Sequence, residues 1–190
     1  MKTEGLLGAG ALDTVIARRD GMPITRLRYL ADVAALAERL PHAGAMLNLS
    51  VDRYRFSVGL GAALLRGHTS LLPPNHTAHT VERLQARFPQ VYALVEAEGE
   101  GHGLPSIIHA ERGATAAAGI AANPPIAADL VAAFVLTSGS TGDPVPHAKP
   151  WSLLAASARA EAKRLAEAIG RDSLVGVSLV ATVPPQHMYG

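Results

Sequence analysis

An apolar segment that runs into a loop of glycines and hydroxyl residues is the feature that most constrains how this chain can fold. Leu130–Leu136 is apolar and rich in residues that favour a buried strand. The six residues that follow are Thr137, Ser138, Gly139, Ser140, Thr141 and Gly142, and none of them is bulky. Glycines let successive backbone N–H groups converge on one point, and four hydroxyls add donors that can surround phosphate oxygens. The segment therefore predicts a strand followed by a loop that binds a polyphosphate.

Two well-known loops of similar composition are excluded by single residues. The phosphate loop of P-loop NTPases needs a lysine after its last glycine, whereas Asp143 follows Gly142. The nucleophile elbow of serine hydrolases needs a glycine two residues before its serine, and Ser138 holds that position before Ser140. From composition alone, a flexible loop that binds nothing remains the alternative.

The order of residues in the loop resembles a known motif. TSGSTG followed by x-Pro, residues 137–144, is similar to the phosphate-loop motif of the adenylate-forming superfamily, which includes acyl- and aryl-CoA synthetases, peptide-synthetase adenylation domains and luciferases. Downstream, VATVPPQHMYG resembles the family's next motif, a strand ending in a proline-containing turn and then His-x-x-Gly, here His187 and Gly190. Upstream, a helix ending at Gly67 and the segment HTSLLPP also suit the family's first subdomain. The resemblance spans most of the chain.

This resemblance implies both a fold and a reaction. The fold is α/β, with a layered, mostly parallel sheet flanked by helices, and residues 1–190 would form an incomplete N-terminal subdomain. The reaction uses ATP and Mg²⁺ to convert a carboxylic acid to an acyl-adenylate. The thiol of CoA or of carrier-protein phosphopantetheine then displaces AMP, so an acyl carrier protein is an expected partner besides the acid.

The same resemblance assigns the site residues. The loop 137–142 would hold the β- and γ-phosphates of ATP, and His187 falls on the family position that borders the acyl site and moves aside as the carboxylate enters. A histidine in an ordinary turn is the alternative for His187. The family's later motifs, which bind Mg²⁺, adenine and ribose and supply the catalytic lysine, have no counterpart up to Gly190. No catalytic residue is assigned, and we expect the 190-residue chain alone to be inactive.

Two residues depart from the family pattern. Val145 stands where members commonly carry lysine after the motif's proline, and Asp143 adds a negative charge beside the predicted phosphate site. Lys149 or His147 could supply the missing cation, which predicts weaker ATP binding in Lys149→Ala. The form PVPHAKPW resembles a branch of ligases from aryl-polyene pigment clusters, which load aromatic acids.

Composition excludes several classes of function. The net charge is +1 and the charged fraction is 17%, so no basic surface argues for nucleic acid or an anionic membrane. The chain has no cysteine, which removes disulfides and thiolate metal sites and fits a reducing compartment. No apolar segment reaches the roughly 18 residues of a membrane span, and the N-terminus does not fit a signal peptide. We expect a cytoplasmic protein.

The rest of the chain alternates helices and strands. Helices are predicted at Ile24–Leu40, at Arg53–Arg66 with Ser50 or Asp52 as its cap, after Thr80 as a cap, and from Trp151 to Ile169. Strands are predicted at Ala45–Leu49, His68–Leu72, Val91–Val95 and Leu174–Val183. This alternation is typical of a largely parallel sheet, whose ligands collect beyond the carboxyl ends of the strands.

Other interpretations remain open at this point. His76 and His79 form H-x-x-H without a third ligand, so we expect solvated loop residues and no metal site. A non-catalytic nucleotide-binding or assembly module of the same fold is the alternative function, favoured by Asp143 and Val145, and a structural domain that binds nothing is the third. A fragment of a larger sheet would expose an apolar edge, which predicts self-association.

Overall fold

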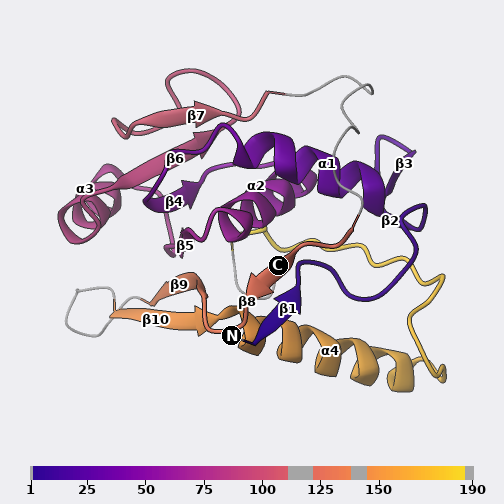
Figure 1. Ribbon diagram of the computed structural model, residues 1–190. Coiled ribbons are helices and arrows are strands. Elements are labelled where there is room, and N and C mark those ends of the chain that lie inside the picture. Colours follow the sequence, from indigo (N-terminus) through magenta and orange to yellow (C-terminus); the bar gives the residue numbers. More distant parts are fainter. Residues whose placement is uncertain (1, 111–121, 138–144, 187–190) are drawn as a thin grey trace.

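A six-stranded sheet organises the computed structural model, which describes residues 2–110, 122–137 and 145–186 (Figure 1). Its strands follow the order β10-β9-β5-β4-β6-β7. They are β4 Ala45–Asn48, β5 Thr69–Leu72, β6 Val91–Val95, β7 Ser106–Ile108, β9 Val131–Thr137 and β10 Val145–Pro150. Neighbouring strands are parallel except for the antiparallel pair β9 and β10. The predicted α/β fold with a mostly parallel sheet is confirmed.

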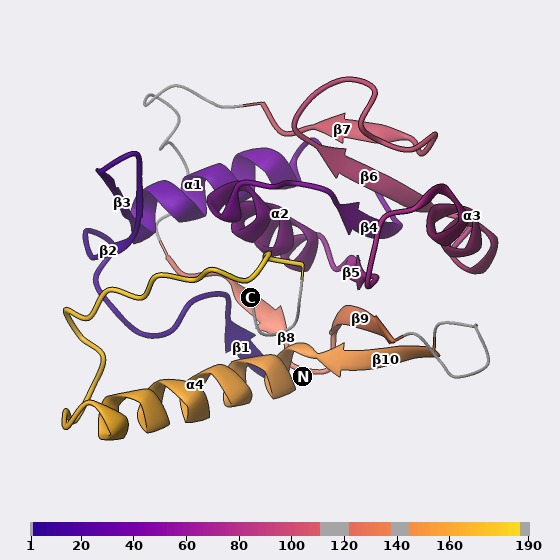
Figure 2. The ribbon, with the colours of Figure 1, turned by 180° about the vertical axis from the view of Figure 1, so that it is seen from behind.

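Helices cover both faces of this sheet. They are α1 Arg26–Ala37, α2 Arg53–Leu65, α3 Ala78–Arg87 and α4 Trp151–Ala168. Because side chains alternate along a strand, Met46 of β4 packs with α1 and α2, whereas Leu47 packs with Val81 and Leu84 of α3. Helix α4 lies apart from them, along β1 and β10 (Figures 1 and 2). None of the described helices is long and apolar enough to cross a membrane.

Two short antiparallel pairs flank the main sheet. Strand β1, Thr3–Gly5, pairs with β8, Pro125–Ala127. Strand β2, Val15–Arg19, forms a hairpin with β3, Met22–Thr25. Strand β3 of the hairpin ends at Thr25, so α1 begins at Arg26 and not at the predicted Ile24. The helix ends at Ala37, before the predicted Leu40.

Two glycines bring α2 close to its neighbours. An added Cβ at Gly59 would lie 2.5 Å from the side chains of both Asn48 and Leu94. At Gly61 it would lie 2.8 Å from Val33 and 2.9 Å from the Tyr29 hydroxyl. These glycines therefore permit a close approach, since any larger residue would push α2 away from the sheet or from α1.

The helix caps confirm one sequence prediction and correct another. The Asp52 side chain accepts a hydrogen bond from Arg55 N at 2.8 Å and begins α2, as predicted. Helix α3 is capped by Thr77, whose hydroxyl accepts from Thr80 N at 3.3 Å. The predicted cap at Thr80 was wrong because the chain already turns at Asn75, whose side chain accepts from both threonine hydroxyls.

The predicted strand Leu174–Val183 was also wrong. Residues 171–186 have no regular secondary structure and run back from the end of α4 past α2 (Figure 2). Side chains in this segment are exposed, Val180 by 90% and Val175 by 80%. A strand needs a neighbour for its backbone groups, and none of the described strands pairs with this segment. Its apolar sequence alone therefore does not produce a strand here.

A buried histidine makes the stability of this fold depend on pH. His68 is 3% exposed and its Nδ1 lies 2.9 Å from the Tyr92 hydroxyl. Burial lowers the pKa of His68 below its usual 6.5. The unfolded chain therefore takes up a proton that the folded chain does not, and the free energy of unfolding should fall as pH drops below about 6.5.

Urea unfolding at pH values on both sides of about 6.5 checks this expectation. The midpoint should be lower on the acid side, and His68→Gln should reduce the difference. His79→Gln replaces an exposed histidine of α3 and should leave the difference unchanged. An equal pH dependence in the wild type and in His68→Gln would contradict the assignment.

Candidate nucleotide-binding site

The predicted phosphate loop leaves the sheet at the edge where ligands of parallel sheets collect. Strands β4, β5, β6, β7 and β9 run in parallel, so their carboxyl ends meet at one edge. The chain leaves that edge after Thr137, the last residue of β9, and returns at Val145, which lies opposite Thr137 in β10. Ser138, Gly139, Ser140, Thr141 and Gly142 lie outside the described residues. The structure therefore places the two ends of the loop.

The register of β10 separates the two candidate cations. His147 lies opposite Val135, two residues from Val145, and Lys149 lies opposite Ala133, four residues from Val145. At the rise of a strand, Lys149 is about 13 Å from the base of the loop and His147 about 7 Å. A lysine side chain is shorter than the first of these distances. The register therefore places His147 nearer than Lys149 to the ends of the loop.

A cavity of about 390 Å³ lies at the same edge, beyond the carboxyl end of β4. Its walls are the segment from Asn48 to Val51, Arg53, His76, Thr182 and the turn Pro184–Gln186. The Arg53 guanidinium donates a hydrogen bond to the carbonyl oxygen of Val183. The second predicted motif thus reaches the carboxyl edge of the sheet without being a strand. His187 follows this turn and lies outside the described residues.

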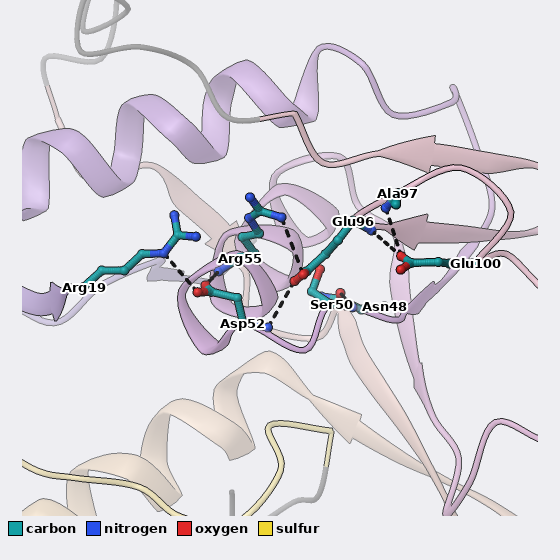
Figure 3. Close-up of polar contacts among 8 residues, drawn as sticks. All are labelled: Arg19, Asn48, Ser50, Asp52, Arg55, Glu96, Ala97 and Glu100. Atoms are coloured by element: carbon teal, nitrogen blue, oxygen red, sulfur yellow. Dashed lines mark hydrogen bonds and ion pairs between the residues drawn. The ribbon is translucent and has the colours of Figure 1, made fainter.

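Figure 3 shows a polar network that joins the segment after β4 to the segment after β6. The amide of Asp52 donates to Glu96 Oε1 at 3.0 Å, and Glu96 Oε2 lies 3.5 Å from Arg55 Nη1. Asp52 Oδ2 also pairs with Arg19 Nε at 3.0 Å. The chain after β4 leads to β5 on one side of the β4–β6 pair, and the chain after β6 leads to β7 on the other side. In parallel α/β sheets, a ligand-binding crevice opens where two neighbouring strands have connections that leave in opposite directions. Asp52 and Glu96 therefore join the segments that follow β4 and β6 at this edge of the sheet.

A second, smaller cavity lies between α1 and α2. Its volume is about 80 Å³, enough for a few water molecules and too small for a nucleotide. Asp32 lines it and is bonded to Arg28 Nε at 2.8 Å and to the Tyr54 hydroxyl at 2.7 Å. Burial raises the pKa of Tyr54 and lowers the pKa of His109, which also lines this cavity. The bond between Asp32 of α1 and Tyr54 of α2 stabilises the contact between the two helices.

The prediction that His76 and His79 are solvated loop residues was wrong for His79, which is exposed but helical, and His76 is only partly exposed. His76 lines the larger cavity, and His79 lies in the first turn of α3. Within residues 2–110, 122–137 and 145–186, no group of three or more His, Cys, Asp or Glu side chains could hold a metal ion.

Comparison with known proteins relates this fold to a set of enzymes. No protein-family model matches the sequence, and no curated protein sequence matches it. Among solved structures, the N-terminal subdomain of NpsA from Klebsiella oxytoca, in complex with 3-hydroxybenzoyl-AMSN, is 17% identical with a TM-score of 0.54, over 75% of this chain and 38% of that chain. The o-succinylbenzoate CoA synthetase MenE from Bacillus subtilis, in complex with the acyl-adenylate OSB-AMP, is 14% identical with a TM-score of 0.57, over 88% and 45%.

A malonyl-CoA ligase with methylmalonyl-CoA and AMP bound is 25% identical with a TM-score of 0.57, over 82% of this chain and 34% of that chain. These structural neighbours are adenylate-forming enzymes. The chain spans less than half the length of each of the three. The fold of this chain is therefore that of the N-terminal part of adenylate-forming enzymes.

Proposed function

We propose that this chain is the N-terminal portion, residues 1–190, of an ATP-dependent ligase of acyl or aryl carboxylic acids. One observation carries the proposal: the TSGSTG loop joins β9 to β10 at the carboxyl edge of a sheet with the fold of adenylate-forming enzymes. The loop 137–142 holds the β- and γ-phosphates of ATP through its amides and hydroxyls. His187 borders the acyl site.

The proposed reaction has two halves. A carboxylate oxygen of the acid attacks the α-phosphorus of ATP, the bond to the β-phosphate oxygen breaks, and an acyl-adenylate and pyrophosphate form. A thiol of CoA or of a carrier-protein phosphopantetheine then attacks the acyl carbon, and AMP leaves as the thiol loses its proton. Neither half needs a protein nucleophile, so alignment and neutralisation of phosphate charge are the work of the site.

Mg²⁺ would neutralise part of that charge when bound. Its usual ligands in such sites are one or two carboxylates together with substrate phosphates. In the part of the chain that the structure describes, no group of three or more His, Cys, Asp or Glu side chains could hold a metal ion, so none of these residues is assigned to Mg²⁺.

The cation beside the loop can be identified by substitution. We expect His147→Ala to weaken ATP binding by roughly tenfold, because a hydrogen bond from the imidazole to phosphate is lost. Lys149→Ala should change the affinity less, since Lys149 lies two residues further from the loop. Calorimetric titration of both variants with ATP tests the order. A larger loss in Lys149→Ala would reverse the assignment.

The proposal also concerns which acid the enzyme activates and which thiol accepts the acyl group. The segment PVPHAKPW supports an aryl-acid ligase of the aryl-polyene kind, and a carrier-protein acceptor is consistent with PA1221, a structural neighbour that contains adenylation and PCP domains. A panel of carboxylic acids, tested with the complete enzyme and both types of thiol, would identify them.

We propose further that the enzyme works in the cytoplasm and that residues 1–190 alone form no adenylate. Pyrophosphate exchange above background by this chain would contradict the last point.

Asp143 and Val145 favour a second function, a nucleotide-binding or assembly module without catalysis. Both stand beside the phosphate loop, where a negative charge and a missing lysine weaken the attraction for phosphate. Coding sequence that continues beyond Gly190 into the family's acidic, ribose-binding and lysine motifs would favour the ligase. A stop codon directly after Gly190 would favour the module.

A further inference from the structure

Four arginines line the small cavity between α1 and α2, here called the arginine cavity. They are Arg19 of β2, Arg28 of α1, Arg39 just after α1 and Arg55 of α2. Figure 3 shows the guanidinium groups of Arg19 and Arg55 on the same side of Asp52. Guanidinium groups that reach one space from several elements are typical of a site for phosphate or another oxyanion.

Positive charge exceeds negative charge around the arginine cavity. Three of its arginines form ion pairs, which are Arg19–Asp52 at 3.0 Å, Arg28–Asp32 at 2.8 Å and Arg55–Glu96 at 3.5 Å. Among the described residues, no carboxylate pairs with Arg39, so the guanidinium groups outnumber the carboxylates by one. A guanidinium has five N–H donors, so an arginine can hold a carboxylate and an oxyanion at the same time.

A buried ring nitrogen adds a further donor. His109 lines the arginine cavity, and its Nδ1 is buried without a hydrogen-bond partner in the described part of the chain. Burial, together with the positive charges of Arg55 and Arg39, lowers the pKa of His109. The neutral ring can carry its proton on Nδ1 and donate it. Because a buried polar atom is normally paired, this nitrogen indicates that a ligand or water completes the site.

The size and shape of the arginine cavity select a small anion. Its volume of about 80 Å³ corresponds to roughly five to eight water molecules at 10–15 Å³ each. Phosphate has five non-hydrogen atoms and therefore fits, whereas a nucleotide does not. Because the guanidinium groups come from β2, α1 and α2, they do not share one plane, which suits a tetrahedral oxyanion better than a planar carboxylate.

We propose that the arginine cavity binds one phosphate-sized oxyanion, which is either inorganic phosphate or the phosphate group of a larger molecule. The four arginines and His109 Nδ1 donate to its oxygens. All the residues that line this cavity lie between Arg19 and Ala110. The cavity therefore shares no residue with the loop 137–142 or with β9 and β10, and it is a second site, separate from the one proposed for ATP.

Equilibrium titration with inorganic phosphate tests the site. Arg39→Gln should weaken phosphate binding at least tenfold, because charge-assisted bonds are lost. Arg39→Lys should weaken it less, since lysine keeps the charge without the planar fork. Arg39 is exposed, so neither variant should impair folding. Arg87→Gln is the control, because Arg87 is exposed at the end of α3 and should leave the affinity unchanged.

The NMR titration of His109 shows where the phosphate binds. A bound anion stabilises the charged imidazole, so phosphate should raise the pKa of His109 in the wild type and not in Arg39→Gln. The signals of His109 are assigned by their loss in His109→Gln. Replacing Ser138, Ser140 and Thr141 by alanine should leave this response unchanged. The proposed ATP site can therefore fail without affecting the arginine cavity, and the reverse also holds.

A phosphomonoester, glycerol 3-phosphate, distinguishes the two sources of the anion. Tighter binding than that of inorganic phosphate would support the phosphate group of a larger molecule, and weaker binding would support free phosphate. Three results would overturn the proposal: no saturable binding of phosphate, equal losses in Arg39→Gln and Arg87→Gln, or an unchanged pKa of His109 with phosphate bound. An effect of acetate equal to that of phosphate would also overturn it, since general screening by anions would then explain both.

Discussion

Replacing Gly59 by alanine is expected to destabilise the fold by roughly 2–3 kcal/mol, although alanine is the better helix former. The added Cβ would lie 2.5 Å from Leu94 Cδ2 and 2.5 Å from Asn48 Nδ2. Asn48 is 3% exposed and donates from Nδ2 to the Phe56 carbonyl at 3.0 Å, so it cannot turn away without breaking this bond. Helix α2 would have to move away from β4 and β6.

Urea unfolding of Gly59→Ala measures this change. Gly8→Ala is the control, because a Cβ at Gly8 would meet nothing within 4 Å. Its free energy of unfolding should stay within about 0.5 kcal/mol of the wild type. A neutral or stabilising Gly59→Ala would show that helix propensity outweighs packing at this position and would contradict the close approach of α2 to the sheet.

Asp52→Ala is expected to destabilise the fold by about 2 kcal/mol. The substitution removes the cap of α2, with its 2.8 Å bond from Arg55 N, and leaves Arg19 without the 3.0 Å ion pair. Removal of an ordinary cap costs about 1 kcal/mol, and the lost ion pair of half-buried side chains accounts for the rest.

Two further variants separate these contributions. Asp52→Asn keeps an oxygen that can cap the helix and should cost less than Asp52→Ala. Thr77→Ala removes the exposed cap of α3, which has no ion pair, and should cost about 1 kcal/mol. Equal unfolding free energies for Asp52→Ala and Thr77→Ala would show that the network around Asp52 adds nothing to the cap.

Continuous apolar segments were the most predictable part of the fold. Three of them form strands of the main sheet: Ala45–Asn48, Val91–Val95 and Val131–Thr137. Such strands are apolar along their whole length because helices cover both faces of a parallel sheet. Leu174–Val183 has the same kind of sequence and is irregular. The difference lies in the neighbours available for its backbone, and periodicity carries no information about those.

Some elements were missed although the sequence carried a signal. The β2–β3 hairpin turns at Asp20 and Gly21, whose φ angles are +51° and +76°. Asp-Gly between short strands is a strong hairpin signal. Strand β10 was harder to predict, because Pro146 and Pro150 argue against a strand unless it lies at an edge, as β10 does.

The candidate site was predictable in part. The order of glycine and hydroxyl residues indicated a phosphate loop, and the structure places its two ends at the carboxyl edge of the sheet. The preference for His147 over Lys149 came from the register of β10 against β9, which cannot be read from the sequence. Glu96 was not predicted at all, since its contact with Asp52 joins residues that are 44 positions apart.

Binding of ATP compared with AMP tests the central claim most directly. A loop that holds the β- and γ-phosphates should give this chain at least a tenfold preference for ATP over AMP in equilibrium titration. A variant with Ser138→Ala, Ser140→Ala and Thr141→Ala, checked for folding by urea unfolding, should show a clearly smaller preference for ATP, because only the backbone amides and Thr137 remain to hold the phosphates. Equal affinities for ATP and AMP in the wild type, or an unchanged preference in the variant, would contradict the claim that this loop grips the phosphates of ATP.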